Sequence, residues 1–134
     1  MGNVLKQSKD LVEAIKCYKK AIKFKPNYTD AYFNLANALH DQGELEAAVG
    51  YFQQTIKDLP RHTKAYFNMS VALNEMGDLD AAILGYEKAL QLQPEYPEAW
   101  NNLGNSFIDR GDLAKAKESF RSAIQINPEY STPY

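Results

Sequence analysis

A repeat with a period of 34 residues constrains the fold of this chain more than any other feature. Pro26, Pro60, Pro94 and Pro128 are each 34 residues apart, and self-similarity at such a period is typical of stacked supersecondary units. Other residue types keep the same register, in columns of aromatic, small, glycine and alanine residues: Tyr32, Tyr66 and Trp100; Ala36, Ser70 and Gly104; Gly43, Gly77 and Gly111; Ala48, Ala82 and Ala116; Tyr18, Phe52, Tyr86 and Phe120. The chain is therefore predicted to fold as a linear array whose units pack on their neighbours.

Each unit is predicted to hold two helices separated by a glycine. Apolar residues recur at helical spacing on both sides of Gly43, Gly77 and Gly111, and a glycine just past a helix end permits the positive φ of a C-cap. The proline further on ends the second helix, because the residue before a proline is pushed out of the helical conformation. The predicted helices cover residues 11–24, 30–42, 45–58, 64–76, 79–92, 98–110 and 113–126.

The first unit departs from this pattern. Residues 1–7 are predicted to be the last turns of a helix whose beginning is missing, since Gly2 falls in the column of Gly104. Lys9 takes the place of the turn glycine. An acidic residue follows each turn, where it suits the positive end of the next helix and where Asp can also cap it; these residues are Asp10, Glu44, Asp78 and Asp112.

The clearest copy of the unit lies at residues 97–130. Its pattern of aromatic, Leu-Gly, aromatic, Ala, aromatic, Ala and Pro is formed by Trp100, Leu103, Gly104, Phe107, Ala116, Phe120, Ala123 and Pro128. This pattern resembles the tetratricopeptide (TPR) repeat, a helix-turn-helix unit of about 34 residues. The resemblance covers essentially the whole chain and implies an all-α, right-handed solenoid. It divides the chain into a partial repeat at 1–28, full repeats at 29–62, 63–96 and 97–130, and residues 131–134, which begin a further repeat or form a tail.

Charge and composition exclude several classes of function. The net charge is -2 and the pI is about 5.7, so the chain lacks the basic footprint of a nucleic-acid-binding protein. No apolar run reaches the roughly 20 residues of a membrane-spanning helix, and the N-terminus lacks the apolar stretch of a secretory signal. Cys17 is the only cysteine, which is compatible with a reducing compartment. We expect a cytoplasmic protein without a membrane span.

No catalytic or metal-binding constellation is evident in the sequence. His40 and His62 lack Cys or His partners at the spacing of a zinc site. The glycines are dispersed at repeat spacing and form no phosphate-binding loop, and the acidic residues fall at helix starts and on exposed faces. We therefore expect neither enzymatic activity nor a cofactor.

The candidate site is a polar stripe on the first helix of each unit. At about 100° per residue, Tyr32 and Leu35 lie on one side of the helix at 30–42, and Phe33, Asn34 and Asn37 lie roughly opposite. The second stripe cannot face the partner helix, so it is predicted to face a ligand. The equivalent positions of all units give the candidate residues Asp30, Phe33, Asn34, Asn37, Lys64, Phe67, Asn68, Glu98, Asn101, Asn102, Asn105 and Asp109.

Asparagine recurs in two columns of this stripe. One column holds Asn34, Asn68 and Asn102, and the other holds Asn3, Asn37 and Asn105, with Val71 interrupting. Asparagine is a mediocre helix former, so its recurrence requires a reason. Its amide can donate and accept together, which suits bonding to the backbone of a peptide ligand. Alternatively, the amides bond between neighbouring helices and fix their stacking.

In the TPR family the corresponding stripe lines a concave groove that holds peptides, and the resemblance implies the same here. The asparagines would hold the ligand backbone. Phe33 and Phe67 would supply apolar contact, and Lys64, Glu98 and Asp109 would tune the charge preference, which favours a ligand with hydrophobic and basic residues. We predict a protein-interaction module that binds an extended or helical segment of a partner protein.

Two other functions are open at the level of the sequence. The Asn-Leu-Ala-Asn and Asn-Leu-Gly-Asn runs are similar to the asparagine ladder of the O-linked N-acetylglucosamine transferase superhelix, and to runs in many bacterial TPR proteins. The chain would then be a substrate-recruiting segment of a larger glycosyltransferase. Because the array shows no obvious polar cap, it would alternatively self-associate through its exposed ends as a structural scaffold.

Overall fold

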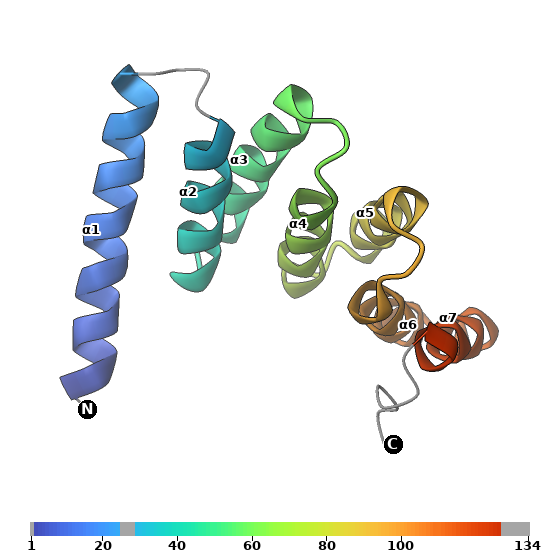
Figure 1. The fold of residues 1–134 in the computed structure, drawn as a ribbon. Coiled ribbons are helices and arrows are strands. Elements are labelled where there is room, and N and C mark those ends of the chain that lie inside the picture. The colour runs from blue at the N-terminus through green and yellow to red at the C-terminus, as the bar shows by residue number, and fades with distance from the viewer. Residues whose placement is uncertain (1, 25–28, 127–134) are drawn as a thin grey trace.

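The structure is a computed structural model that describes residues 2–24 and 29–126, with side chains from residue 12 onward. In these ranges seven helices follow one another and no strand occurs. Figure 1 shows their arrangement. The helices are α1 (Gly2–Phe24), α2 (Thr29–Asp41), α3 (Leu45–Asp58), α4 (Thr63–Glu75), α5 (Leu79–Leu92), α6 (Pro97–Arg110) and α7 (Leu113–Ile126). The predicted all-α class is confirmed.

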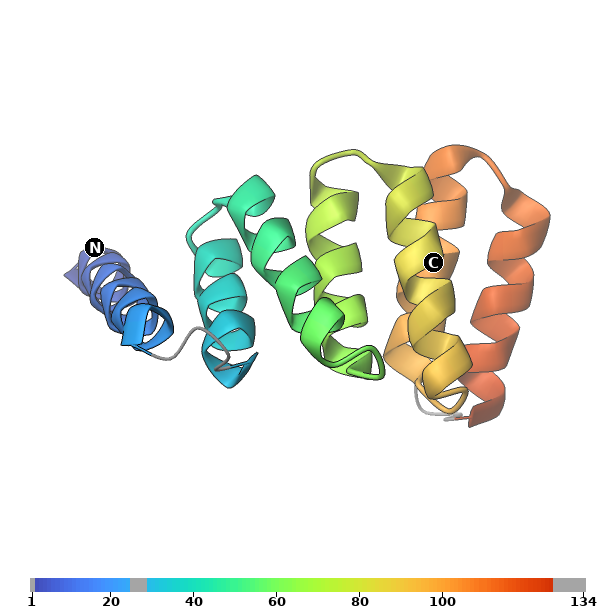
Figure 2. The ribbon, with the colours of Figure 1, turned by 90° about the horizontal axis from the view of Figure 1, so that it is seen from above.

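The helices pair in the order of the repeats. α2 packs on α3, α4 on α5 and α6 on α7, and α1 packs on α2. Successive pairs are joined by contacts of α3 with α4 and of α5 with α6. The first helices α2, α4 and α6 also contact one another in turn along one side of the row, with α3, α5 and α7 along the other (Figures 1 and 2). This is the stacked solenoid that the repeat predicted.

The turns inside each pair are formed by glycine, as predicted. Gly43, Gly77 and Gly111 have φ angles of 87°, 86° and 95°. After the first of these turns, the Glu44 amide donates to the Leu39 carbonyl at 2.8 Å. This bond satisfies a carbonyl at the end of the helix, as in the Schellman type of glycine C-cap. The glycine turn thereby reverses the chain so that the second helix can pack on the first.

The predicted break near Lys9 is wrong. α1 is one continuous helix from Gly2 to Phe24, so Asp10 lies within it and not at a helix start. The turn cannot form easily because Lys9 stands where the other units have glycine. The left-handed conformation costs a residue with a Cβ about 1–2 kcal/mol, whereas lysine is a good helix former. Residue 1, the predicted loop at 25–28, residues 127–134 and the side chain of Asn3 lie outside the described part of the protein.

The predicted caps are realised in part. Asp78 Oδ1 accepts a hydrogen bond from the Ala81 amide at 3.3 Å, as expected for an N-cap residue. Glu44 makes no side-chain cap bond, because its carboxylate is one methylene further from the backbone. His62 caps the first helix α4, for which no cap was predicted, since its Nδ1 accepts from the Ala65 amide at 3.1 Å. The local start signals therefore differ between repeats that share one fold.

The core runs through the columns of alternating small and large residues. Ala36 and Phe52 are fully buried between α2 and α3. Between α6 and α7, Gly104 lies against the ring of Phe120, and a Cβ on Gly104 would be 2.7 Å from Phe120 Cε1. Small residues thus allow the paired helices to interlock closely. This packing fixes the side of each first helix that faces outward.

Candidate functional site

The predicted binding residues lie on α2, α4 and α6, which are neighbours along one side of the row. We call the surface formed by these twelve residues the asparagine face. Those that are exposed are Asp30, Asn34, Lys64, Glu98, Asn105 and Asp109, and those that are half-buried are Phe33, Asn37, Phe67, Asn68, Asn101 and Asn102. All of them therefore lie at the surface, on the first helices of successive repeats.

Asn37 and Asn68 are bonded to each other. Asn68 Nδ2 donates to Asn37 Oδ1 at 2.9 Å, which links α4 to α2. For this pair the stacking interpretation holds, because the bond joins two neighbouring repeats. The Asn37 amino group and the Asn68 carbonyl oxygen take no part in this bond. Each side chain therefore keeps one hydrogen-bonding group for a second partner.

Asn102 is hydrogen-bonded to the Tyr86 hydroxyl of α5. Burial raises the pKa of Tyr86 above its ordinary value, while the Asn102 bond lowers it in part and the charge of Glu75 raises it further. The net direction of the pKa shift is upward, so the hydroxyl keeps its proton to a higher pH than an ordinary tyrosine does. Asn102 thereby ties α6 to the preceding repeat.

Asn34 and Asn105 behave differently from the other asparagines. Both are exposed, and neither amide bonds to another residue that the structure describes. Each amide carries two donor hydrogens and an acceptor oxygen. We call these two side chains the open amides of the asparagine face, because they are exposed and make no hydrogen bond within residues 12–24 and 29–126.

Phe33 and Phe67 are shared between the core and the surface. The ring centroid of Phe33 lies 6.0 Å from that of Phe52 in α3. Phe67 packs in the equivalent way on Tyr86 at 5.8 Å and also stacks on Tyr96 at 4.9 Å. Both rings therefore pack inside their own repeats, against the second helix or the residues that follow it, and only their exposed parts can contact a ligand.

The asparagine face carries a surplus of negative charge. Asp30, Glu98 and Asp109 are exposed and form no ion pair within residues 12–24 and 29–126. Lys64 is the positively charged member of the predicted set, and it is also exposed. This balance favours a ligand segment that carries basic residues.

Sequence reasoning missed a further column that joins the repeats. His40 Nε2 lies 3.1 Å from Glu75 Oε2, which links α2 to α4. Ser106 Oγ donates to Asn74 Oδ1 at 3.0 Å, which links α6 to α4. His40 and Asn74 are 34 residues apart and so occupy equivalent positions in two repeats. A search of this column for polar residues could therefore have found these contacts between repeats.

A separate cavity of about 450 Å³ lies on the outer surface of α6 and α7. Apolar side chains form most of its lining, which consists of Ile108, Leu113, Ala116, Lys117, Phe120, Arg121 and Ile124. We call this surface the end face. Leu113 is 63% exposed, whereas Leu45 and Leu79 are half-buried at the equivalent positions of the inner pairs. No described helix packs on the end face.

The described side chains also limit other kinds of site. They include no group of three His, Cys, Asp or Glu residues that could hold a metal ion. No helix in the described ranges is long and apolar enough to cross a membrane. The thiol of Cys17 is free and exposed.

Family models match most of the chain. A model described as TPR repeat matches residues 2–43 and 71–108. Two models described as tetratricopeptide repeat match residues 97–130 and 31–64. Together these matches span the regions in which the repeat columns were found. No curated protein matches the chain.

Solved structures of MamA share the fold. A crystal structure of MamA is 24% identical, with a TM-score of 0.84 over 92% of this chain and 69% of that chain. MamA from Desulfovibrio magneticus RS-1, residue 41 to the end, is 22% identical, with a TM-score of 0.86 over 98% of this chain and 75% of that chain. A further MamA crystal structure is 22% identical, with a TM-score of 0.73 over 96% and 95% of the two chains. At these identities the likeness shows the fold alone.

Proposed function

Because the chain belongs to the tetratricopeptide repeat family, whose members are protein-interaction scaffolds, we propose that its asparagine face captures an extended segment of a partner protein. The observation that carries this proposal is the pair of open amides, Asn34 and Asn105, on α2 and α6. Each amide can donate to and accept from a peptide backbone whatever the side chains of the ligand are. The site therefore recognises an extended conformation first and a sequence second.

The other asparagines form the framework of this site. Asn37 and Asn68 bond to each other, and Asn102 bonds to Tyr86, so these amides hold α2, α4, α5 and α6 in register. A ligand that binds Asn34 and Asn105 then meets helices whose spacing is already fixed. Such preorganisation reduces the ordering cost of binding.

The preferred ligand carries basic residues. Asp30, Glu98 and Asp109 outnumber Lys64 among the charged members of the face. This imbalance attracts positively charged segments, speeds their association and makes binding sensitive to ionic strength. The exposed parts of Phe33 and Phe67 add apolar contact to the same segment.

Selection from a displayed peptide library tests the proposal. We compare the native protein with an Asn34→Ala, Asn105→Ala double variant. The matched control is Gln53→Ala with Gln125→Ala, because these amides are equally exposed but lie on the second helices α3 and α7. Circular dichroism first establishes that all three proteins have the same helix content and melting temperature.

The native protein and the control are expected to enrich the same basic peptides. The Asn34→Ala, Asn105→Ala variant is expected to bind the selected peptide at least about tenfold more weakly, which is about 1.4 kcal/mol. Undiminished affinity in this variant would show that the open amides are not the binding groups. Failure of the native protein to enrich any peptide would reject the proposal as a whole.

Self-assembly is a second candidate function, favoured by the apolar cavity of the end face. A second copy that covers this cavity would bury Leu113 and its neighbours. In light scattering, the mass of the native protein would then rise with concentration, and Leu113→Glu would keep it monomeric. A native protein that is monomeric at all concentrations would exclude this candidate. The glycosyltransferase alternative stays a prediction.

A further inference from the structure

A cavity of about 560 Å³ lies between α5 and α7, with α6 at its base. Trp100, Leu103 and Phe107 of α6 line it, together with Glu87 of α5 and Glu118 of α7. We call it the α5–α7 cavity. At about 100° per residue, these three α6 side chains lie on the side of the helix opposite the asparagine face. The α5–α7 cavity is therefore a separate surface, and its volume falls within the range of about 300–1,000 Å³ typical of ligand sites.

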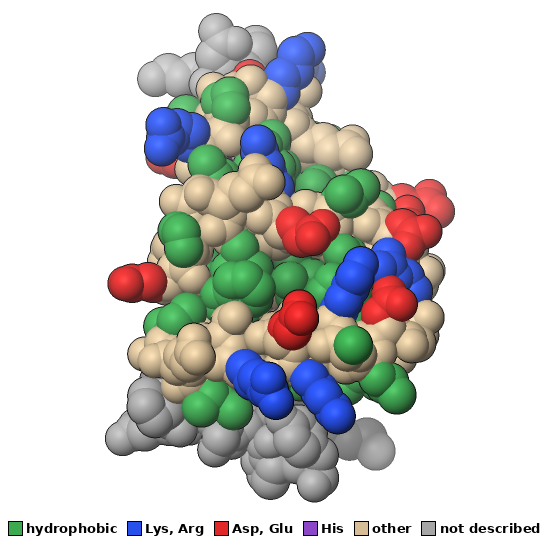
Figure 3. Space-filling model, turned by 90° about the vertical axis from the view of Figure 1, so that its right-hand side faces the viewer, with side chains coloured by type: hydrophobic (Ala, Val, Ile, Leu, Met, Phe, Trp, Pro, Cys, Tyr) green, Lys and Arg blue, Asp and Glu red, His purple; other side chains and the backbone are tan. Residues whose placement is uncertain are grey.

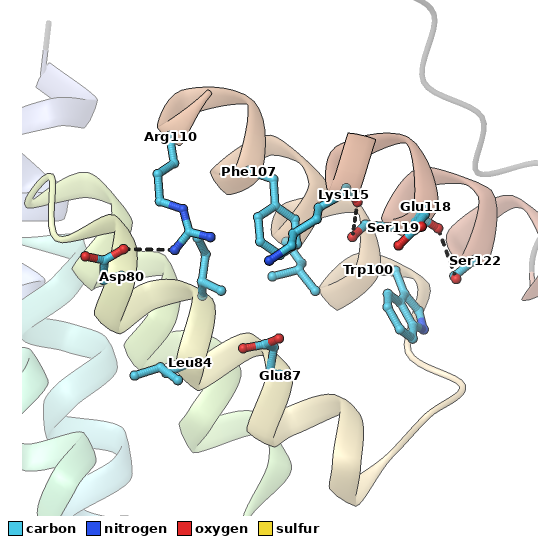
Figure 4. Close-up of a pocket in the computed structure, with 12 residues that line it drawn as sticks. Asp80, Leu84, Glu87, Trp100, Phe107, Arg110, Lys115, Glu118, Ser119 and Ser122 are labelled. Carbon is cyan, nitrogen blue, oxygen red and sulfur yellow. Dashed lines mark hydrogen bonds and ion pairs between the residues drawn. The ribbon is translucent and has the colours of Figure 1, made fainter. Parts of the chain in front are cut away.

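The base of the cavity is apolar and rigid. Leu103 and Phe107 are buried members of the core. Trp100 is half-buried, and its indole Nε1 donates to the Pro94 carbonyl at 2.9 Å, which fixes the ring. Figure 4 shows Trp100 and Phe107 directed into the space between the helices. Leu84 at the rim is 68% exposed, so an apolar group that enters removes further apolar surface from water.

Arg110 is already neutralised at one end of the cavity. Its Nη1 lies 2.9 Å from Asp80 Oδ1, and its Nη2 lies 2.6 Å from Asp112 Oδ2. The guanidinium is also 5.5 Å from the centroid of the Phe107 ring. With two carboxylates bound to it, Arg110 has little capacity left for an anionic ligand.

The remaining charges of the lining give a negative balance. Glu87 and Glu118 are exposed and form no ion pair with any described residue. Lys115 supplies one positive charge beside these two carboxylates, and its Nζ lies 5.8 Å from the centroid of the Phe107 ring. Figure 3, which looks at the α5 and α7 end of the row, shows apolar side chains at the centre of this surface with charged side chains around them. The cavity thus combines an apolar base with acidic walls.

We propose that the α5–α7 cavity binds a segment of a partner protein that presents a bulky apolar side chain next to a lysine or arginine. The apolar side chain packs on Leu103, Phe107 and Trp100. The basic group lies between Glu87 and Glu118, where it completes the charge balance that Lys115 alone leaves negative. This site acts independently of peptide capture on the asparagine face.

Trp100 provides a direct readout, because it is the only tryptophan of the chain and lies in the cavity. The probe is an alanine-based helical peptide of about 16 residues, without tryptophan, that carries leucine and lysine four positions apart on one face. A second probe has glutamate in place of lysine. Binding of the first probe is expected to exclude water from the indole and to shift its emission to shorter wavelength, and added salt is expected to weaken the binding.

Variants of the two acids test the charge contacts. Glu87→Gln with Glu118→Gln is expected to weaken binding of the lysine probe about tenfold, which corresponds to a loss of about 1.4 kcal/mol. The control, Glu44→Gln with Glu46→Gln, changes the net charge equally at exposed positions outside the cavity. It is expected to bind like the native protein, as is the Asn34→Ala, Asn105→Ala variant. Because the Asn34→Ala, Asn105→Ala variant alters the asparagine face and leaves the cavity intact, this comparison distinguishes loss of binding in the cavity from loss of peptide capture on the asparagine face.

Three outcomes would overturn the proposal. One is an unchanged Trp100 emission with the lysine probe up to about 1 mM. Another is equal binding of the lysine and glutamate probes. The third is full binding by the folded Glu87→Gln, Glu118→Gln variant.

Discussion

The α4/α5 and α6/α7 pairs meet the same packing requirement with different residues. α4 has Ser70 where α6 has Gly104, and α5 has Gly85 where α7 has Ser119. Gly85 leaves room for Ser70, whereas Gly104 leaves room for the ring of Phe120. The repeat therefore fixes the summed volume between two helices and not the residue at each position.

The exchange leaves the two hydroxyl groups in different situations. Ser119 Oγ donates to the Lys115 carbonyl at 3.1 Å. Ser70 Oγ is fully buried and has no partner among the described residues. An unsatisfied buried polar group costs about 1–3 kcal/mol of stability. The α4/α5 pair therefore carries this cost at Ser70, whereas the α6/α7 pair avoids it because the Ser119 hydroxyl is hydrogen-bonded.

The largest effect is expected for Gly104→Ala. The new Cβ would meet three atoms of the Phe120 ring, the nearest at 2.7 Å, and overpacking of this kind costs about 1–3 kcal/mol. Urea denaturation should therefore show a free energy of unfolding lower by about 2 kcal/mol. Gly50→Ala is the control, because nothing lies within 4 Å of a Cβ there, and it should gain up to about 1 kcal/mol of helix propensity. Equal stability of the two variants would contradict this account of the α6/α7 pair.

A smaller effect is expected for Gly85→Ala, whose Cβ would run into Ser70 Oγ. A hydroxyl can rotate more easily than a ring can shift, so the expected loss is about 1 kcal/mol. The loss should disappear in the Ser70→Ala background, because the obstructing oxygen is then absent. A double-mutant cycle measures this coupling. Additive effects of the two substitutions would show that Ser70 and Gly85 do not compensate each other.

Tyr86 and Phe120 occupy the same column, and pH distinguishes them. The pKa of Tyr86 is raised in the folded protein, chiefly by burial, so the folded state holds this proton at a pH where the unfolded state has released it. The resulting stability is present below the unfolded value of about 10 and is lost as pH rises above it, by about 1 kcal/mol per pH unit. Unfolding curves across this range should fall less steeply for Tyr86→Phe than for the native protein. Parallel curves would contradict the assignment.

The smallest effect is expected for Ser70→Ala alone. Removal of the unpartnered hydroxyl should leave the stability unchanged or raise it by up to about 1 kcal/mol. Ser119→Ala removes a hydroxyl that is hydrogen-bonded and should lower the free energy of unfolding by about 0.5–1 kcal/mol. Thermal or urea denaturation of the two variants compares these signs. Destabilisation by Ser70→Ala would mean that its hydroxyl is satisfied after all.

The sequence predicted the fold because its signals are local and repeated. The glycines Gly43, Gly77 and Gly111 and the apolar columns fix the helix pairs within short stretches, and the structure has helices and turns at those places. At Lys9 the same reasoning failed, since it extended a turn to a unit that lacks the glycine required for it. The period identifies equivalent positions, but each residue still decides whether a turn can form there.

The candidate site was predictable only in part. Periodicity placed the described asparagines of the stripe at the surface, but it could not distinguish the bonded Asn37–Asn68 pair from Asn34 and Asn105. That distinction depends on distances between repeats, which are set by packing. The α5–α7 cavity was not predicted, because it depends on how three consecutive helices pack in space and not on a pattern within any one of them.

The most direct test of peptide capture is NMR of the side-chain amides during titration with the peptide selected from the library. The account predicts shifts at the Asn34 and Asn105 amide groups while the Trp100 indole signal and the Leu113 methyl signals stay in place. Shifts confined to Trp100 or Leu113, with unchanged Asn34 and Asn105 signals, would place the ligand on another surface and contradict the central claim.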